Sequence, residues 1–179
     1  MQNFINSVRL SLQTQNWYAA LTVALTLPDI AGKIDYPTNP GSRARYETWY
    51  NQYLLPTYTI QLPDPEQPAG SIGIVKKKDV VFMTGNDCYA LRCSFLHQGM
   101  DEIANQPARN ILERFIFYVP NSNNNVNHLN FRGNTLSLQI QLFCEEIIAA
   151  IERWLADIAN DAAKQQLLNN MVRLYQFLP

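Results

Sequence analysis

One short stretch of the chain combines residue types that together can hold a phosphate group and move protons. Within residues 84–99, TGNDCYALRCSFLHQG, three polar residues follow one another at intervals of five: Asp87, Arg92 and His97. An arginine presents a permanent, forked positive charge that suits a phosphate. A histidine exchanges a proton near neutral pH as general base or general acid. These two roles suffice for RNA cleavage through its own 2′-hydroxyl without a metal ion, and Asp87 can orient either partner.

The same stretch is predicted to form a short helix that positions these side chains. Thr84 or Asn86 can cap its start, and the carboxylate in its first turn suits the helix dipole. Gly99 is placed to end the helix. Five residues correspond to about 500° of rotation, so Arg92 and His97 are offset by about 140° around the axis. They do not stack on one face, but both can flank one shallow pocket.

Each of these side chains also has a purely structural interpretation. His97 can satisfy the carbonyl groups at the helix end near Gly99. Arg92 can form an ion pair with Asp87 or with another buried carboxylate. The second histidine, His128, lies in an Asn-rich segment and is predicted to be exposed.

The run LRCSFLHQG resembles a motif of a known family. Arg92 and His97 enclose four residues on a helix that ends in glycine, as in the HEPN superfamily, and the run is similar to the "LRN…LLHG"-type sequences common there. Its members are small α-helical bundles, often dimeric, and many are metal-independent ribonucleases of toxin–antitoxin, abortive-infection and other anti-phage systems. The resemblance implies that Arg92 and His97 form the catalytic pair and that Asp87 is the acidic residue often preceding it. It also implies a homodimer that brings two such pairs into one cleft.

The function expected from these residues is therefore that of a HEPN-like bacterial endoribonuclease in a toxin or anti-phage defence system. Arg92 would bind phosphate, and His97 would act as general acid and base. The alternatives are a non-catalytic helical bundle that binds a partner or a nucleotide, and an enzyme whose site lies elsewhere. Further candidates for substrate binding are Lys76, Lys77, Lys78 and Ser94, although a lysine run is also typical of a solvated surface. The expected partners are RNA, a second copy of the chain, and an antitoxin or defence-system protein.

The composition limits the other classes of protein. Charged residues make up only 16% of the 179 residues, amides are abundant (18 Asn and 13 Gln), and the net charge is -1. This excludes a globally basic nucleic-acid coat protein, but residues 76–132 carry seven basic and five acidic side chains and leave room for a local basic site. Three cysteines and two histidines make neither a disulfide set nor a structural zinc site. We therefore expect no metal, no cofactor and a reduced, cytoplasmic setting. No apolar run reaches the roughly 18–20 residues of a membrane span, so no membrane partner is expected.

The hydrophobic periodicity predicts a mainly α fold: one domain, 1–179, built as a helical bundle with a small β-hairpin insertion. Apolar residues recur at helical spacing in 4–12 and again from Trp17, after Asn16 as a plausible N-cap. Pro28 is expected to end or kink this second helix, and Gly32 with Pro37 marks its exit. Three further helices are predicted. An aromatic stripe indicates one over 46–53, a long apolar stripe indicates one over 140–158, and apolar residues at helical spacing indicate a last one over 167–178. The acidic residues of the long stripe are interpreted as its solvated face.

Two segments interrupt the helical pattern. The proline-rich stretch 57–80 is predicted to be a long extended loop. Phe115–Val119 (FIFYV) is β-branched and aromatic, which predicts a β-hairpin over 115–136 with Asn121–Asn127 as its loop. Gly133–Asn134 offers a second, tighter turn in the same segment.

Overall fold

The structure confirms a mainly α-helical chain. The computed structural model describes residues 1–63, 77–121, 123 and 126–172. The helices in this part of the chain are α1 (Gln2–Gln13), α2 (Trp17–Asp35), α3 (Ser42–Tyr53), α4 (Gly85–Gln98), α5 (Ile140–Asp157) and α6 (Ala162–Asn169), with a 3₁₀ turn at Leu55–Tyr58. The strands are β1 (Thr59–Pro63), β2 (Lys77–Val81), β3 (Arg114–Tyr118), β4 (Asn130–Arg132) and β5 (Thr135–Gln139). Among the described residues, no helix combines the length and the apolar character needed to cross a membrane.

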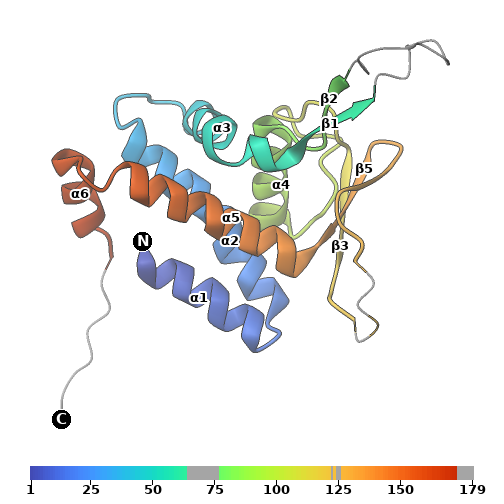
Figure 1. The fold of residues 1–179 in the computed structure, drawn as a ribbon, viewed down its shortest axis with the longest axis horizontal. Helices are drawn as coiled ribbons and strands as arrows, with labels where there is room; N and C mark the ends of the chain where they lie inside the picture. The colour runs from blue at the N-terminus through green and yellow to red at the C-terminus, as the bar shows by residue number, and fades with distance from the viewer. Residues whose placement is uncertain (64–76, 122, 124–125, 173–179) are drawn as a thin grey trace.

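Helix α2 is the element against which most other helices pack. It contacts α1, α3 and α5 along its length and touches α4 and α6 (Figure 1). As predicted, Asn16 caps it, with its side chain accepting the N–H of Ala19 at 3.3 Å. The helix does not end at Pro28 but continues to Asp35, and Pro28 is buried within it. Burial of α2 against three neighbours outweighs the one backbone hydrogen bond that a proline removes.

The aromatic stripe of α3 is core, as its spacing predicts, and it attaches α4 to the rest of the molecule. All four of its aromatic residues are buried: Tyr46, Trp49, Tyr50 and Tyr53. The Tyr46 hydroxyl lies 3.1 Å from the Cys88 sulfur on α4, and the Tyr50 hydroxyl donates to the Met83 carbonyl at 3.0 Å. These contacts fix both the start and the side of the helix that carries Arg92 and His97.

The prediction of a long loop over 57–80 is wrong at both ends of the segment. Residues 55–58 form a 3₁₀ turn, and β1 pairs antiparallel with β2, with Thr59 opposite Val81 and Pro63 opposite Lys77. The proline-rich middle, residues 64–76, lies outside the described residues. Prolines at the end of an edge strand lose no ladder hydrogen bond, so their number did not preclude strands here.

The predicted hairpin over 115–136 is wrong in its pairing. β3 runs parallel to β5, with Phe115 opposite Leu136, and β4 pairs antiparallel with β5 to give the order β3-β5-β4. The tight turn is the alternative one, Gly133–Asn134, where Gly133 adopts a φ of 61°. β3 and β4 do not pair with each other, so the Asn-rich segment does not join the two strands of a hairpin. Parallel pairing of β3 with β5 places the Phe115 side of β3 in the core. An antiparallel hairpin at the surface would leave that side exposed.

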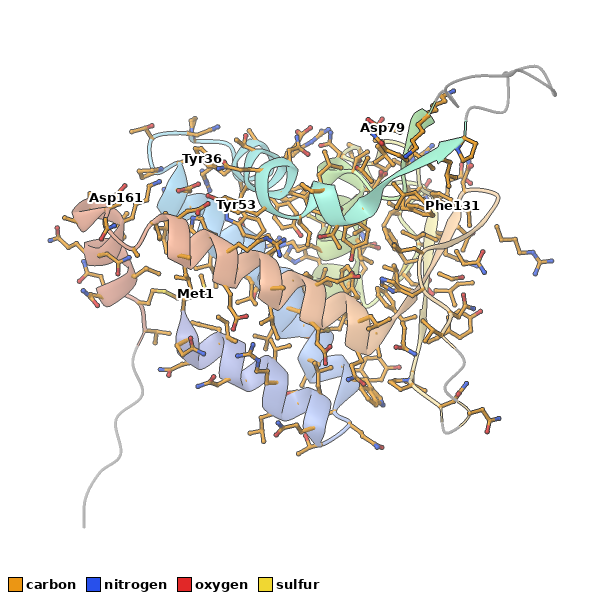
Figure 2. All side chains as sticks on the ribbon, in the orientation of Figure 1. Met1, Tyr36, Tyr53, Asp79, Phe131 and Asp161 are labelled. Carbon is orange, nitrogen blue, oxygen red and sulfur yellow. The ribbon has the colours of Figure 1, made fainter. Side chains whose placement is uncertain are left out.

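The two small sheets meet at one end of the molecule. Asp79 on β2 and Phe131 on β4 both lie at this end, away from Met1 and Asp161 (Figure 2). The ring of Phe131 stacks on Phe82, which follows β2, with centroids 5.0 Å apart. The strands thus form a cap on the helices, while β5 leads directly into α5.

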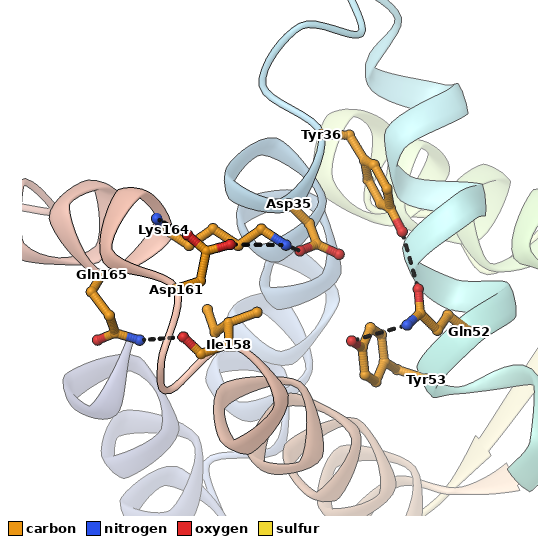
Figure 3. Close-up of polar contacts among 8 residues, drawn as sticks. All are labelled: Asp35, Tyr36, Gln52, Tyr53, Ile158, Asp161, Lys164 and Gln165. Carbon is orange, nitrogen blue, oxygen red and sulfur yellow. Dashed lines mark hydrogen bonds and ion pairs between the residues drawn. The ribbon is translucent and has the colours of Figure 1, made fainter.

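The last helix is shorter and begins earlier than its apolar spacing predicts. It runs from Ala162 to Asn169 behind Asp161, whose side chain accepts the N–H of Lys164. Leu174 and Leu178, two residues of the predicted stripe, lie outside the described residues. Lys164 forms a short ion pair with Asp35 at the end of α2, and Asp161 flanks the same ammonium at 3.8 Å (Figure 3).

The Lys164–Asp35 pair is expected to stabilise the protein in a pH-dependent way. Lys164→Met leaves Asp35, which is 5% exposed, without its cation and should lower the unfolding free energy by about 2 kcal/mol near neutral pH. The hydrogen bond to Asp35 raises the pKa of Lys164 above 10.5. The pair's contribution is therefore complete below that value and is lost as the pH rises through the raised pKa. Urea unfolding of parent and variant should show a constant difference up to about pH 10 that shrinks above it.

Lys33→Met is the matched control, since Lys33 is exposed on α2 and its hydrogen bond in the described structure is a 3.4 Å contact with the Pro37 carbonyl. It should change the unfolding free energy by less than about 0.5 kcal/mol. Equal effects of the two substitutions would show that the ion pair contributes nothing.

Candidate functional site

Helix α4 begins and ends where the sequence predicts. Thr84 caps it in a complete capping box: its hydroxyl accepts the Asp87 N–H at 3.2 Å, and the Asp87 carboxylate accepts the Thr84 N–H at 3.3 Å. At the other end, Gly99 adopts the left-handed conformation with a φ of 69° and closes the helix against the carbonyls of Ser94 and Phe95. Capping groups next to each end of the helix therefore mark where it begins and ends, as the sequence predicts.

Arg92 and His97 contact each other despite their angular offset. Arg92 Nη1 lies 3.4 Å from His97 Nε2, because the long arginine side chain spans the separation along the helix surface. His97 is exposed at the last turn, whereas the Arg92 side chain is 20% exposed. A guanidinium has only donors, so Nε2 is the acceptor and the neutral ring carries its proton on Nδ1.

The carboxylate that orients Arg92 is Asp29 of α2. Arg92 Nη2 donates to Asp29 Oδ2 at 2.8 Å, and the Asp29 side chain is 23% exposed. Burial alone would lower the pKa of Arg92, but the interactions with Asp29 and the neighbouring Cys93 are stronger, and the pKa is raised. The guanidinium therefore stays charged. Its Nε is buried and has no hydrogen-bond acceptor in the described part of the chain. Of the two ion-pair partners considered for Arg92, Asp87 or another carboxylate, the structure therefore shows another carboxylate, Asp29.

Asp87 has a structural role instead of the orienting one predicted for it. Its side chain is completely buried, and Oδ1 accepts three consecutive backbone N–H groups, from residues 110, 111 and 112, at 2.7, 3.0 and 3.1 Å. Oδ2 accepts the Thr84 hydroxyl at 2.6 Å. Both oxygens are therefore used to attach the segment before β3 to the start of α4, one and a half turns away from Arg92.

The predicted substrate-binding residues do not gather around Arg92 and His97. Ser94 is buried, and its hydroxyl donates to the Glu102 carbonyl at 2.7 Å, so it joins α4 to the following segment. Lys77 and Lys78 are exposed on β2, opposite Pro63 and Leu62. In the described structure, neither lysine contacts Arg92 or His97. Lys76 lies outside the described residues.

A second histidine site, which sequence reasoning missed, lies between β5 and α5. The His128 side chain is only 8% exposed, so the prediction that it is exposed is wrong. Its Nδ1 accepts the Gln139 N–H at 3.2 Å, and its Nε2 lies 2.9 Å from Glu146, which also accepts the Tyr58 hydroxyl. Burial and then Glu146 raise the pKa of Tyr58 well above its ordinary value. Glu146 is thus not part of a solvated face.

The His128–Glu146–Tyr58 network is complete without a ligand. Both oxygens of the carboxylate and both nitrogens of the ring have protein partners, so the arrangement joins α5, the 3₁₀ turn and the segment before β4. No sequence signal could have found it, since its members lie 18 and 88 positions apart. Its contribution is to position the strands against α5.

Two of the three cysteine thiols are buried, and no group of metal-ligating side chains is found among the described residues. Burial raises the pKa of the Cys88 thiol to about 12 and that of Cys144 to about 12, which keeps both protonated. In the part of the chain that the structure describes, no three His, Cys, Asp or Glu side chains group as a metal site would require. The candidate site therefore consists of Arg92, His97 and the orienting Asp29.

Comparison with known proteins gives no relative from which a function could be transferred. The chain matches no protein-family model, no curated protein and no solved structure. The grounds for a function are therefore the residues and contacts of the site itself.

Proposed function

We propose that this chain is a HEPN-like helical bundle that cleaves RNA without a metal ion at Arg92 and His97, as a toxin or defence-system protein. The observation that supports this most directly is the 3.4 Å contact between Arg92 Nη1 and His97 Nε2 at the exposed end of α4. It brings together the two side chains that the chemistry requires. Arg92 is held in place by Asp29 from a second helix, as a phosphate-binding arginine should be.

The reaction needs one bond to form and one to break at phosphorus. The 2′-oxygen of a ribose bonds to the adjacent phosphorus as the bond to the 5′-oxygen breaks, leaving a 2′,3′-cyclic phosphate and a 5′-hydroxyl. A base must take the proton of the 2′-hydroxyl, and an acid must give one to the leaving 5′-oxygen. His97 serves the first transfer as the base, and Arg92 stabilises the charge that develops on the phosphate.

A homodimer completes this scheme. One histidine serves one proton transfer at a time, whereas two copies with their Arg92–His97 pairs facing one cleft provide both base and acid. Exposure of His97 at the end of α4 is compatible with such an arrangement.

A second candidate function rests on the same ion pair. The Arg92–Asp29 pair joins α4 to α2, and both side chains are mostly shielded, as in a pair whose role is structural. In that case the chain is a non-catalytic helical protein that binds a partner or nucleotide. Activity measurements separate the two functions.

The test is cleavage of RNA by the purified protein in the presence of EDTA. We expect fragments that end in 2′,3′-cyclic phosphate and begin with a 5′-hydroxyl, because the 2′-oxygen is the nucleophile. A protein with both Arg92→Ala and His97→Ala, purified in the same way, controls for contaminating ribonucleases. Cleavage that EDTA abolishes, or that the double variant retains, would refute the proposal.

A further inference from the structure

A groove of about 530 Å³ adjoins the Arg92 site on the side of α2. We call it the α2–α6 groove. Its polar lining includes Asp29, Lys33 and Arg45, and its apolar lining includes Ile30, Leu167 and Met171. The volume lies in the range of sites for small organic ligands. It combines cations with an apolar floor, which is the combination that a nucleotide requires.

The groove follows from how three helices meet. Asp29 and Lys33 are one turn apart on α2 and therefore share a face. Helix α3 crosses α2 at Gly32, where an added Cβ would lie 2.8 Å from the Arg45 carbonyl oxygen, and this close crossing places Arg45 beside that face. The other wall is α6, which the Lys164–Asp35 ion pair holds against the end of α2 (Figure 3).

Asp29 belongs to both the groove and the Arg92 site. Its Oδ2 accepts an N–H of Arg92 Nη2 at 2.8 Å, so Arg92 offsets the carboxylate that the described residues contribute to the groove. With the Asp29 charge offset, Lys33 and Arg45 give the groove a net positive charge. The nearby carboxylate of Asp35 does not change this, because Lys164 neutralises it.

Two arginines near Asp29 have a side-chain donor without a partner, a property they share with the indole N–H groups of Trp49 and Trp154 in the described part of the chain. Arg45 Nε and Arg92 Nε are both buried without a hydrogen-bond acceptor in the described part of the chain. Buried donors without partners are rare in folded proteins. Arg45 donates through Nη1 to the Asn39 carbonyl, and Lys33 lies 3.4 Å from the Pro37 carbonyl, so within the described residues neither cation is neutralised by a carboxylate contact.

From this geometry we infer that the α2–α6 groove binds the nucleotide of single-stranded RNA that lies next to the cleaved phosphate. Lys33 and Arg45 contact its phosphate, and the base lies on the apolar floor of Ile30, Leu167 and Met171. A base reaches such a floor only when it is unstacked, which selects single strands. The inference rests on the proposed function, because it takes the Arg92–His97 pair as the place of cleavage.

The experiment measures binding separately from cleavage. The probe is a short, fluorescein-labelled 2′-O-methyl RNA of mixed sequence, which the protein cannot cleave because the 2′-oxygen is blocked. Fluorescence anisotropy across a salt series gives affinity and salt slope together. Lys33→Gln should weaken binding several-fold and reduce the slope of log K against log salt by about 0.7, the value for one phosphate contact on a single strand.

Two further variants separate this groove from other surfaces. Leu167→Glu places a carboxylate on the floor at a position that is 40% exposed, so the protein should fold and lose most of its affinity. A double variant with Lys77→Gln and Lys78→Gln removes the same kind of charge from β2 and should bind as the parent does. A duplex of the same sequence should bind more weakly than the single strand.

The outcomes distinguish failure of this inference from failure of the proposed function. If the parent cleaves RNA but Lys33→Gln and Leu167→Glu bind the probe as the parent does, the groove inference is wrong and the nuclease proposal stands. If both variants lose affinity while the parent does not cleave RNA, the groove binds RNA and the nuclease proposal is wrong. A parent that does not bind the probe, or loss of binding only on β2 substitution, also overturns the groove inference.

Discussion

Asp87→Ala is expected to lower the unfolding free energy by about 3–5 kcal/mol. The substitution leaves three backbone N–H groups, of residues 110–112, without their acceptor, that of Leu112 buried and the other two part-buried, and it also removes half of the Thr84 capping box. Each unsatisfied buried donor costs about 1–3 kcal/mol, and a lost cap about 1 kcal/mol. Urea unfolding followed by circular dichroism measures the effect.

Asp79→Ala provides the matched control for Asp87→Ala. Asp79 is an exposed aspartate on β2 (Figure 2), and its replacement should cost less than about 0.5 kcal/mol. If Asp87→Ala were as stable as Asp79→Ala, the carboxylate would not hold the 110–112 segment, and an orienting role for Asp87 would have to be reconsidered.

His97→Ala is expected to reduce the rate of RNA cleavage by about 10²- to 10⁴-fold, the usual contribution of a general acid or base. The unfolding free energy should change by less than about 0.5 kcal/mol, because His97 is exposed and its contact in the described structure is the 3.4 Å approach of Arg92. A fixed-time assay on labelled RNA, together with urea unfolding, gives both numbers. A residue with only a structural role would show the opposite pattern.

Arg92→Lys tests the geometry of the site rather than its charge. Lysine keeps the positive charge but cannot contact Asp29 and a phosphate with one planar fork, so cleavage should fall well below the parent rate. Arg9→Lys is the control, because Arg9 pairs with Glu152 on an exposed surface of α1 and α5. If His97→Ala and Arg92→Lys both cleave at the parent rate, the site is not at this helix.

The helices of this protein follow from local sequence. The caps at Asn16, Thr84 and Gly99 form hydrogen bonds within three or four residues of the chain. The apolar stripes of α3 and α5 indicate which face of each helix is buried. Both kinds of signal depend on neighbours in the chain, so they could be read without coordinates. At Pro28, where an end or a kink of the helix was expected, burial against neighbouring helices lets α2 continue to Asp35. The start of α6 was misplaced because its local cap, Asp161, was not used in the prediction.

The strands could not be assigned in the same way. Phe115–Val119 was correctly predicted as extended, but its partner is β5 rather than the next extended segment. Pairing is decided by which strand can bury the Phe115 face under the helices, and that depends on where α5 lies. The two ends of 57–80 pair with each other for a similar reason, since Phe82, at the end of β2, packs on Phe131 of β4.

For the candidate site, the sequence by itself determined that Arg92 and His97 lie near each other on one capped helix, since five residues on a helix fix that separation. Only the tertiary structure decided which carboxylate pairs with Arg92. Asp29 reaches Arg92 from a position 63 residues earlier, while Asp87, which is nearer in sequence, is used by backbone groups 23 to 25 residues later. Helical spacing is a local property of the backbone, whereas the partner of a charged side chain depends on which elements pack beside it, and no spacing in the chain encodes that choice.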